Sequence, residues 1–215
     1  MTNRYSSSVR ASIRALAALA LVALRISAFG AAWESSKEAE SFRKGDIASV
    51  KRILQKETYS EALILEAFPT AITSGNVELI KYLASLGWME ACRKDQYCMP
   101  IHLAARYGRV DAMKFFISQG FDVHAITAPT KRGGGGKNSA LHLAAKMGNL
   151  DAAKFLCEQG VDADLKNEYG RTALGDAKYT ASIRSLGATK KEDARNRAKV
   201  SKVIEYLESG QCKKK

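Results

Sequence analysis

Two stretches of this chain, whose starts lie forty residues apart, carry nearly the same pattern. Residues 99–125 read MPIHLAARYGRVDAMKFFISQGFDVHA, and residues 139–165 read SALHLAAKMGNLDAAKFLCEQGVDADL. Each stretch has a run of small and apolar residues that a glycine ends, then a second apolar-periodic run, a Gln-Gly pair and a polar segment. Self-similarity at a fixed period is typical of repeat arrays, in which each unit buries its apolar face against its neighbours.

The first run of both stretches is similar to the Thr-Pro-Leu-His-x-Ala signature of the ankyrin-repeat family. Residues 99–104 read MPIHLA and residues 139–144 read SALHLA, so Met99 and Ser139 replace the threonine and Ala140 replaces the proline. The chain therefore resembles an ankyrin-repeat protein. The resemblance implies an all-α fold, an ankyrin-repeat solenoid of about five helix pairs with short extended fingers.

The spacing of the glycines that end each first helix predicts the other units. These glycines stand at positions 45, 75, 108 and 148, at spacings of 30, 33 and 40 residues, against a family period of about 33. The ankyrin-repeat domain is expected over residues 33–210, with Gly87, Gly120 and Gly160 as left-handed caps of second helices. The array is predicted to end, after an extra segment at residues 182–195, in a capping helix with an apolar stripe of Val200, Val203, Ile204 and Leu207.

The N-terminal segment has the features of a targeting sequence. Residues 15–24 read ALAALALVAL, an apolar run that is too short to span a bilayer, which takes about 20 residues. Three arginines precede the run and small residues follow it, so residues 1–32 are predicted to be a cleaved signal peptide of an exported protein, periplasmic or secreted. A mitochondrial transit peptide is an alternative, because the segment has four Arg, no Lys and no acid before Glu34. An uncleaved anchor is the third possibility.

Four cysteines follow the predicted cleavage site, and an even number in an exported chain permits disulfides. Fingers of the resembled family fold back as hairpins, which is expected to bring Cys92 and Cys98 close enough to bridge. A bridge between Cys157 and Cys212 is a second possibility. Residues 211–215 are expected to form a basic tail.

No constellation for catalysis or metal binding is readable in the sequence. His102 and His142 lack the spacing of zinc ligands, and the resemblance implies that each holds the turn between repeats by hydrogen bonds. Residues 130–138, TKRGGGGKN, fail the spacing of a phosphate loop and are interpreted as an insertion at a finger tip. We therefore expect no enzyme, no cofactor and no metal.

The chain has a formal net charge of +12, which favours acidic partners, anionic lipid or nucleic acid non-specifically, or simply serves solubility. Part of this charge is a basic run near the C-terminus, which consists of Lys190, Lys191, Arg195, Arg197, Lys199 and Lys202. Since no aromatic residues interleave with the run, base stacking has no candidate, and the run is interpreted as a solvated surface of the cap.

The predicted function is that of a protein–protein interaction scaffold in an exported protein. Its alternatives are a secreted effector acting on a host-cell protein and a basic binder of nucleic acid or anionic surfaces. The resemblance implies contacts from finger tips and first-helix ends, to a partner protein with an acidic surface. The candidate partner-binding residues are Lys94, Asp95, Gln96, Tyr97, Arg106, Tyr107, Lys131, Arg132, Lys146, Met147, Glu168 and Tyr169. Tyr97, Arg106 and Tyr107 are expected to be the costliest of these to truncate, at roughly 1–3 kcal/mol each.

The signal-peptide hypothesis predicts that the mature chain begins at Ala31 or Trp33. N-terminal sequencing of the protein from its native source measures this directly. An intact Met1, or a start well before Gly30, would contradict the prediction.

Overall fold

The computed structural model describes residues 37–56, 61–94, 98–128, 136–183 and 189–212. Several predicted features lie outside these ranges, namely the signal peptide at residues 1–32, most of the glycine-rich insertion and the last three residues of the tail. The chain divides into two units, residues 1–67 and residues 68–215, and each is described by itself. In the described ranges, no helix is both long and apolar enough to cross a membrane.

The first unit contains a short helical hairpin. Helices α2 (Lys37–Lys44) and α3 (Ile47–Lys56) are joined at Gly45, whose φ of 69° lies in the left-handed region. Asp46 accepts a hydrogen bond from the backbone N–H of Ser49 at 3.2 Å, which satisfies a free donor in the first turn of α3. Phe42 of α2 and Val50 of α3 are fully buried.

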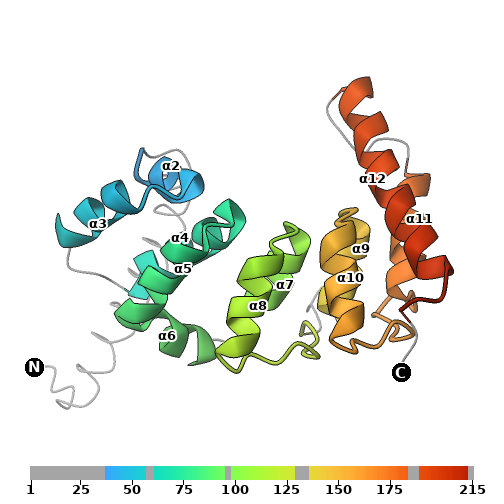
Figure 1. Cartoon of the computed structure of the whole chain (residues 1–215), viewed down its shortest axis with the longest axis horizontal. Helices are drawn as coiled ribbons and strands as arrows, with labels where there is room; N and C mark the ends of the chain where they lie inside the picture. Colours follow the sequence, from blue (N-terminus) through green and yellow to red (C-terminus); the bar gives the residue numbers. More distant parts are fainter. Residues whose placement is uncertain (1–36, 57–60, 95–97, 129–135, 184–188, 213–215) are drawn as a thin grey trace, which may run out of the picture. The chain divides into compact units, whose positions relative to one another are not determined.

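The second unit is a stack of helix pairs (Figure 1), and the all-α solenoid predicted from the repeats is confirmed. First helices α7, α9 and α11 contact one another in chain order, and so do second helices α5, α8, α10 and α12. Helix α4 begins in the first unit and ends in the second. The bounds are α4 (Glu61–Ser74), α5 (Val77–Leu83), η1 (Ala84–Trp88), α6 (Met89–Lys94), α7 (Pro100–Arg106), α8 (Val110–Ser118), α9 (Ala140–Lys146), α10 (Leu150–Glu158), α11 (Ala173–Ser182) and α12 (Lys190–Glu208).

Small side chains allow the first helices to pack closely. The Ala-Ala pairs 104–105 in α7 and 144–145 in α9 are fully buried, and so is Leu141. Large apolar side chains fill the space toward α4 and α5, where Phe68 meets Trp88 and Phe116 edge-on, with ring centroids 5.4 Å and 5.9 Å apart. Edge-to-face contact is the arrangement that the charge distribution of aromatic rings favours.

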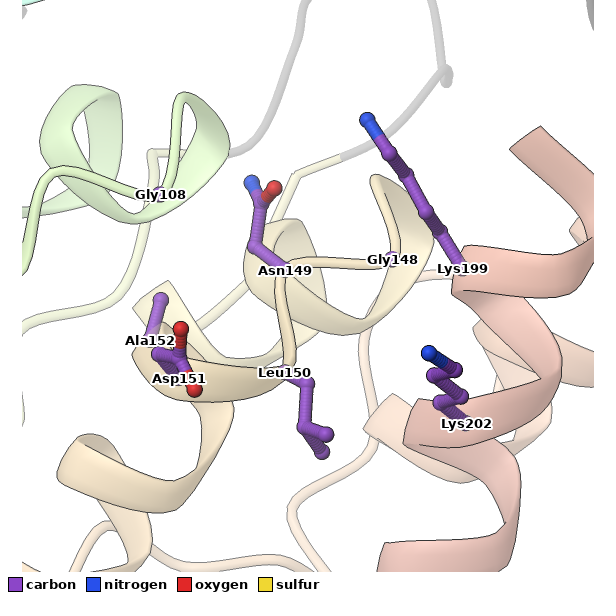
Figure 2. A pocket seen from close by; sticks show the side chains of 8 residues that line it. All are labelled: Gly108, Gly148, Asn149, Leu150, Asp151, Ala152, Lys199 and Lys202. Carbon is purple, nitrogen blue, oxygen red and sulfur yellow. The ribbon is translucent and has the colours of Figure 1, made fainter. Parts of the chain in front are cut away.

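The glycines after the first helices bring neighbouring repeats into backbone contact. Gly148 has a φ of 70°, and a Cβ atom built on it would lie 2.8 Å from both the Cβ of Lys199 and the backbone nitrogen of Val200. Any larger residue would therefore push α12 away from the α9–α10 turn. Figure 2 shows Gly148 facing α12 at Lys199.

The fingers differ from one another. In the finger between α8 and α9, Ile126 and Ser139 form an antiparallel bridge. The backbone N–H of Thr127 donates to the carbonyl of Asn138 at 2.9 Å. The next finger is a tight turn closed by the N–H of Asn167, which donates to the carbonyl of Arg171 at 2.9 Å. These two segments are the extended fingers that the sequence predicts.

The segment after Gly87 is helical where an extended finger was expected. Gly87 does have the left-handed φ of a cap, at 90°, but the chain continues directly into α6. A positive φ turns the chain without preventing a new helix, and Trp88 and Met89 are buried at the start of this one. The expectation of a finger here is wrong for the described part, which ends at Lys94.

The final helix begins earlier than the sequence interpretation placed it. Residues 190–195 belong to α12 and not to an extra segment before it. Thr189 accepts a hydrogen bond from the N–H of Glu192 at 3.2 Å, and Glu192 and Asp193 lie at the positive end of the helix dipole. This cap stabilises the first two turns of α12, which lie N-terminal to the apolar stripe.

Two disulfides use all four cysteines. Cys92, in the last turn of α6, is bonded to Cys98 just before α7, with a Cα–Cα distance of 5.2 Å. Cys157 of α10 is bonded to Cys212, which follows α12, with a Cα–Cα distance of 4.9 Å. The second bridge ties the end of the cap helix to the preceding repeat.

The two disulfides are expected to differ in their contribution to stability. The chain-entropy model gives about 4 kcal/mol for the Cys157–Cys212 bridge, which spans 55 residues, and about 2 kcal/mol for Cys92–Cys98, which spans 6. The pairs C157A/C212A and C92A/C98A should lower the free energy of unfolding in guanidinium chloride in that order. Wild-type protein treated with a dithiol reductant is the control, and an equal loss from both pairs would contradict the loop-length argument.

Candidate functional site

Buried histidines join successive repeats. The Nε2 of His102 in α7 lies 3.1 Å from the carbonyl oxygen of Asn138, and the Nε2 of His142 in α9 lies 3.0 Å from that of Arg171. A carbonyl only accepts, so Nε2 carries the proton in both rings. Asn138 and Arg171 each directly precede the N-cap of the next first helix, and each bond therefore fixes where the next repeat begins. The sequence-based role of the two histidines agrees with these contacts.

The environment of both rings favours their neutral form. Burial lowers the pKa of His102 and of His142 below the ordinary value, against a smaller opposing effect of the carbonyls that they contact. In His142 the unprotonated Nδ1 accepts from the hydroxyl of Ser139 at 2.9 Å. Both ring nitrogens of neutral His142 are thus satisfied, and protonation of Nδ1 would remove an acceptor.

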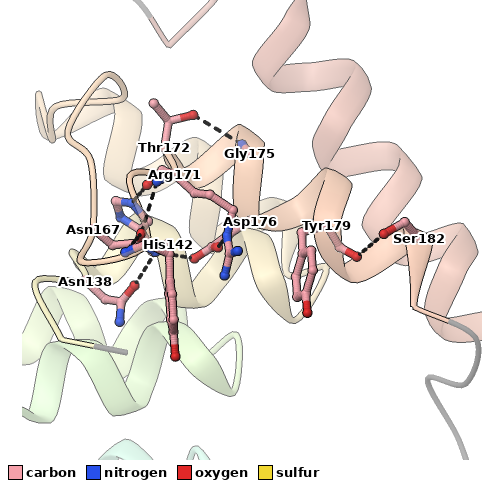
Figure 3. A network of polar contacts seen from close by, with 10 residues as sticks. Asn138, His142, Asn167, Arg171, Thr172, Gly175, Asp176, Tyr179 and Ser182 are labelled. Atoms are coloured by element: carbon pink, nitrogen blue, oxygen red, sulfur yellow. Dashed lines mark hydrogen bonds and ion pairs between the residues drawn. The ribbon is translucent and has the colours of Figure 1, made fainter. Parts of the chain in front are cut away.

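A different polar network replaces the histidine in the last repeat. Gly175 occupies the position equivalent to His142, and Asp176 beside it is buried. Its carboxylate accepts from the Nδ2 of Asn167 at 2.8 Å and from the Nε of Arg171 at 2.6 Å (Figure 3). Asn167 also donates to the side chain of Asn138 at 3.1 Å, which connects the two fingers. The network fixes the guanidinium of Arg171 at the base of the last finger.

Two tyrosines stack on that guanidinium. The guanidinium carbon of Arg171 lies 4.6 Å from the ring centroid of Tyr169 and 4.3 Å from that of Tyr179. Both distances are within the range of cation–π attraction. Tyr169 and Tyr179 remain 50% and 51% exposed, so the cluster presents rigid aromatic surface to solvent.

The predicted first-helix residues occupy equivalent positions in the stack. Arg106 and Tyr107 end α7, Lys146 and Met147 end α9, and all four are exposed. Tyr179 follows the N-cap of α11 by seven residues, as Arg106 and Lys146 follow theirs. We define the recognition row as Arg106, Tyr107, Lys146, Met147, Tyr169, Arg171 and Tyr179.

Sequence reasoning missed two members of the row. Tyr179 could have been found by counting from the N-cap Thr172, but the departure from the signature at Gly175 obscured the register. Arg171 directly precedes the N-cap, and its role depends on the contact with Asp176, which no local pattern indicates.

The other predicted finger residues do not join the row in the described structure. Glu168 is half-buried, and its carboxylate accepts from the N–H of Gly136 at 2.8 Å, so it connects two fingers instead of projecting. Lys94 ends α6. Five candidates lie outside the described residues, namely Asp95, Gln96, Tyr97, Lys131 and Arg132.

A hollow of about 380 Å³ lies along one edge of the stack, beside the C-terminal ends of the first helices α7 and α9 (Figure 2). It is bounded by the first turn of α10, the glycines at 108 and 148, and Lys199 and Lys202 of α12. Asn149 at its edge donates to the carbonyls of Ala105 and Arg106 at 3.0 Å and 2.7 Å. Among the described residues, no three His, Cys, Asp or Glu side chains are grouped to hold a metal ion.

Comparison with known proteins places this architecture among known repeats. Two family models described as ankyrin repeats (many copies) match residues 68–126 and 124–174. The human protein phosphatase 1 regulatory subunit 27 is 32% identical over 87 residues, which are 39% of this chain and 56% of that protein. The chain thus spans about half the length of this curated relative.

The histidine contacts predict a stability that falls with acid. Because the pKa of both rings is lower in the folded state than in the unfolded chain, the unfolded state binds more protons below about pH 6.5. The melting temperature should therefore fall as the pH goes from 7 to 5. H142Q should cost about 1–3 kcal/mol at pH 7.5 through the lost contacts. The same variant should show a flatter pH dependence, and a slope equal to that of the wild type would contradict the assignment.

Proposed function

Because this chain belongs to the ankyrin-repeat family, we propose that it is a protein–protein interaction module whose recognition row binds a partner protein. The observation that carries the proposal is the cluster in which Tyr169 and Tyr179 contact the guanidinium of Arg171, which is itself ion-paired with the buried carboxylate of Asp176. Tyrosine and arginine are the residue types enriched at the energetic centres of interfaces.

Rigidity of the stack supports a role in binding. Association costs free energy when mobile side chains become ordered. The guanidinium of Arg171 is already held by an ion pair of 2.6 Å, and its central carbon lies within 4.6 Å of both ring centroids, so little further conformational freedom is lost when a partner covers the tyrosines. An exposed aromatic pair held in this way offers apolar area at low entropic cost.

The proposed partner has an acidic surface. Arg106 and Lys146 are exposed on the row, whereas the carboxylate of Glu168 is engaged between fingers and that of Asp176 is buried. The row therefore presents positive charge next to aromatic and Met side chains. Rim charges of this kind direct partner choice and association rate more than affinity.

A non-catalytic role is part of the proposal. The human relative that this chain resembles is named as a regulatory subunit of a protein phosphatase. The buried histidines of this chain are both engaged with backbone carbonyls and are shielded from solvent. We propose that this chain acts by binding and not by catalysis.

Export is the proposed location, to the periplasm or the exterior of the cell. Pairing of all four cysteines supports an oxidising compartment, where disulfides persist. The apolar run at residues 15–24, with arginines before it and small residues after it, supports a signal peptide.

The test begins with a photo-crosslinking residue in place of Tyr179, which should capture a partner that can then be purified. Y179A and Y107A should each weaken binding by about 1–3 kcal/mol, measured by titration calorimetry. K81A and K114A, on second helices, are the controls and should change binding by less than about 0.5 kcal/mol.

Circular dichroism should show equal folding of all four variants. R171A is avoided, because it would leave Asp176 without its ion pair in a buried network. Unchanged binding in both tyrosine variants, or an equal loss in the lysine controls, would place the interface elsewhere.

A further inference from the structure

Four cations of the basic run form a single stripe on α12. Lys191, Arg195, Lys199 and Lys202 follow one another at spacings of four, four and three residues. At 3.6 residues per turn, these spacings keep them within roughly 80° of the helix circumference. All four are exposed, and in the described part of the chain none of them has an ion-pair partner.

The opposite face of α12 carries the contacts that hold the cap. Val200 and Val203 are buried there, and Arg197 pairs with Asp193 at 3.1 Å while also donating to the carbonyls of Ala181 and Ile183. The structure thus divides the basic run, which is one block in the sequence, between two faces of α12. Arg197 is structural, and the four cations of the stripe are left toward solvent.

The C-terminal half of the stripe, Lys199 and Lys202, borders the hollow beside the ends of α7 and α9. Lys199 packs on Gly148, and Lys199 and Lys202 line one side of the hollow, opposite Asp151 (Figure 2). The first turn of α10 lines it as well, and its N-cap Asn149 makes no side-chain capping bond because its amide bonds to the preceding repeat. A helix N-terminus adds to the positive potential of the two lysines.

We propose that the basic stripe of α12 binds an acidic segment of a partner protein. Cations four residues apart on a helix are spaced by about 6 Å along its axis. An extended peptide places every second side chain on one side, at about 6.5 Å, so alternate Asp or Glu residues match the stripe. The site is separate from the recognition row, and either surface can bind without the other.

Nucleic acid fits the stripe less well than an acidic peptide does. Binding of single strands combines backbone charge with aromatic rings on which bases stack. The aromatic residue at the end of the stripe, Tyr206, has the ammonium of Lys154 over its ring at 5.7 Å. Glu192 and Glu205 flank the stripe and limit its width.

The experiment uses the full chain and a fluorescein-labelled peptide of six Glu-Ser repeats, followed by fluorescence anisotropy. Binding is expected at 50 mM salt and should weaken steeply at 300 mM, since exposed charges are screened. K199Q/K202Q should bind about tenfold more weakly. K81Q/K114Q, which loses the same charge from α5 and α8, should stay within twofold of the wild type.

Three outcomes would overturn the proposal. These are no binding by the wild type at 50 mM salt, an equal loss in K81Q/K114Q, and tighter binding of a twelve-residue oligothymidylate than of the peptide. Y169A/Y179A tests the recognition row independently and should leave peptide binding unchanged. If K199Q/K202Q does not fold, K191Q/R195Q at the N-terminal end of the stripe replaces it. This variant should also bind the peptide about tenfold more weakly, and binding equal to that of the wild type would overturn the proposal.

Discussion

Hydrogen bonds from side chains to the backbone carbonyls of a neighbouring repeat set the register of one repeat on the next, and the two histidines that make them are buried. His102 and His142 each donate to the carbonyl that precedes the following first helix, and Asn149 donates to the last carbonyls of α7. An unpaired buried polar group costs more than a single bond contributes. Each repeat is therefore held at the one offset that satisfies these groups, and the alanine faces pack at that offset.

The last repeat uses a different device with a consequence for recognition. Gly175 cannot supply the histidine bond, and Asp176 organises Asn167 and Arg171 in its place. The same ion pair that satisfies a buried carboxylate also positions the guanidinium against the rings of two exposed tyrosines. Stability of the last finger and presentation of the candidate binding surface thus depend on one network.

The cap helix α12 combines two tasks on opposite faces. Its apolar stripe and Arg197 close the stack, and the Cys157–Cys212 bridge ties its end to α10. A terminal helix has surface that no further repeat covers, and on α12 four cations are exposed along about three turns, two of which, Lys199 and Lys202, border the hollow beside α10. Terminal position thus explains why the charge is available for a partner.

The sequence by itself determined the repeat period and the helix pairs, because these depend on local spacing that recurs along the chain, and the resemblance to the ankyrin-repeat family implied the role of the two histidines. Tertiary structure decided the rest. The helix after Gly87, the place of Tyr179 beside Arg171, and the division of the basic run between structure and surface all depend on contacts between residues far apart or on opposite helix faces. A one-dimensional pattern predicts which residues share a face, but only packing determines which face a neighbour covers.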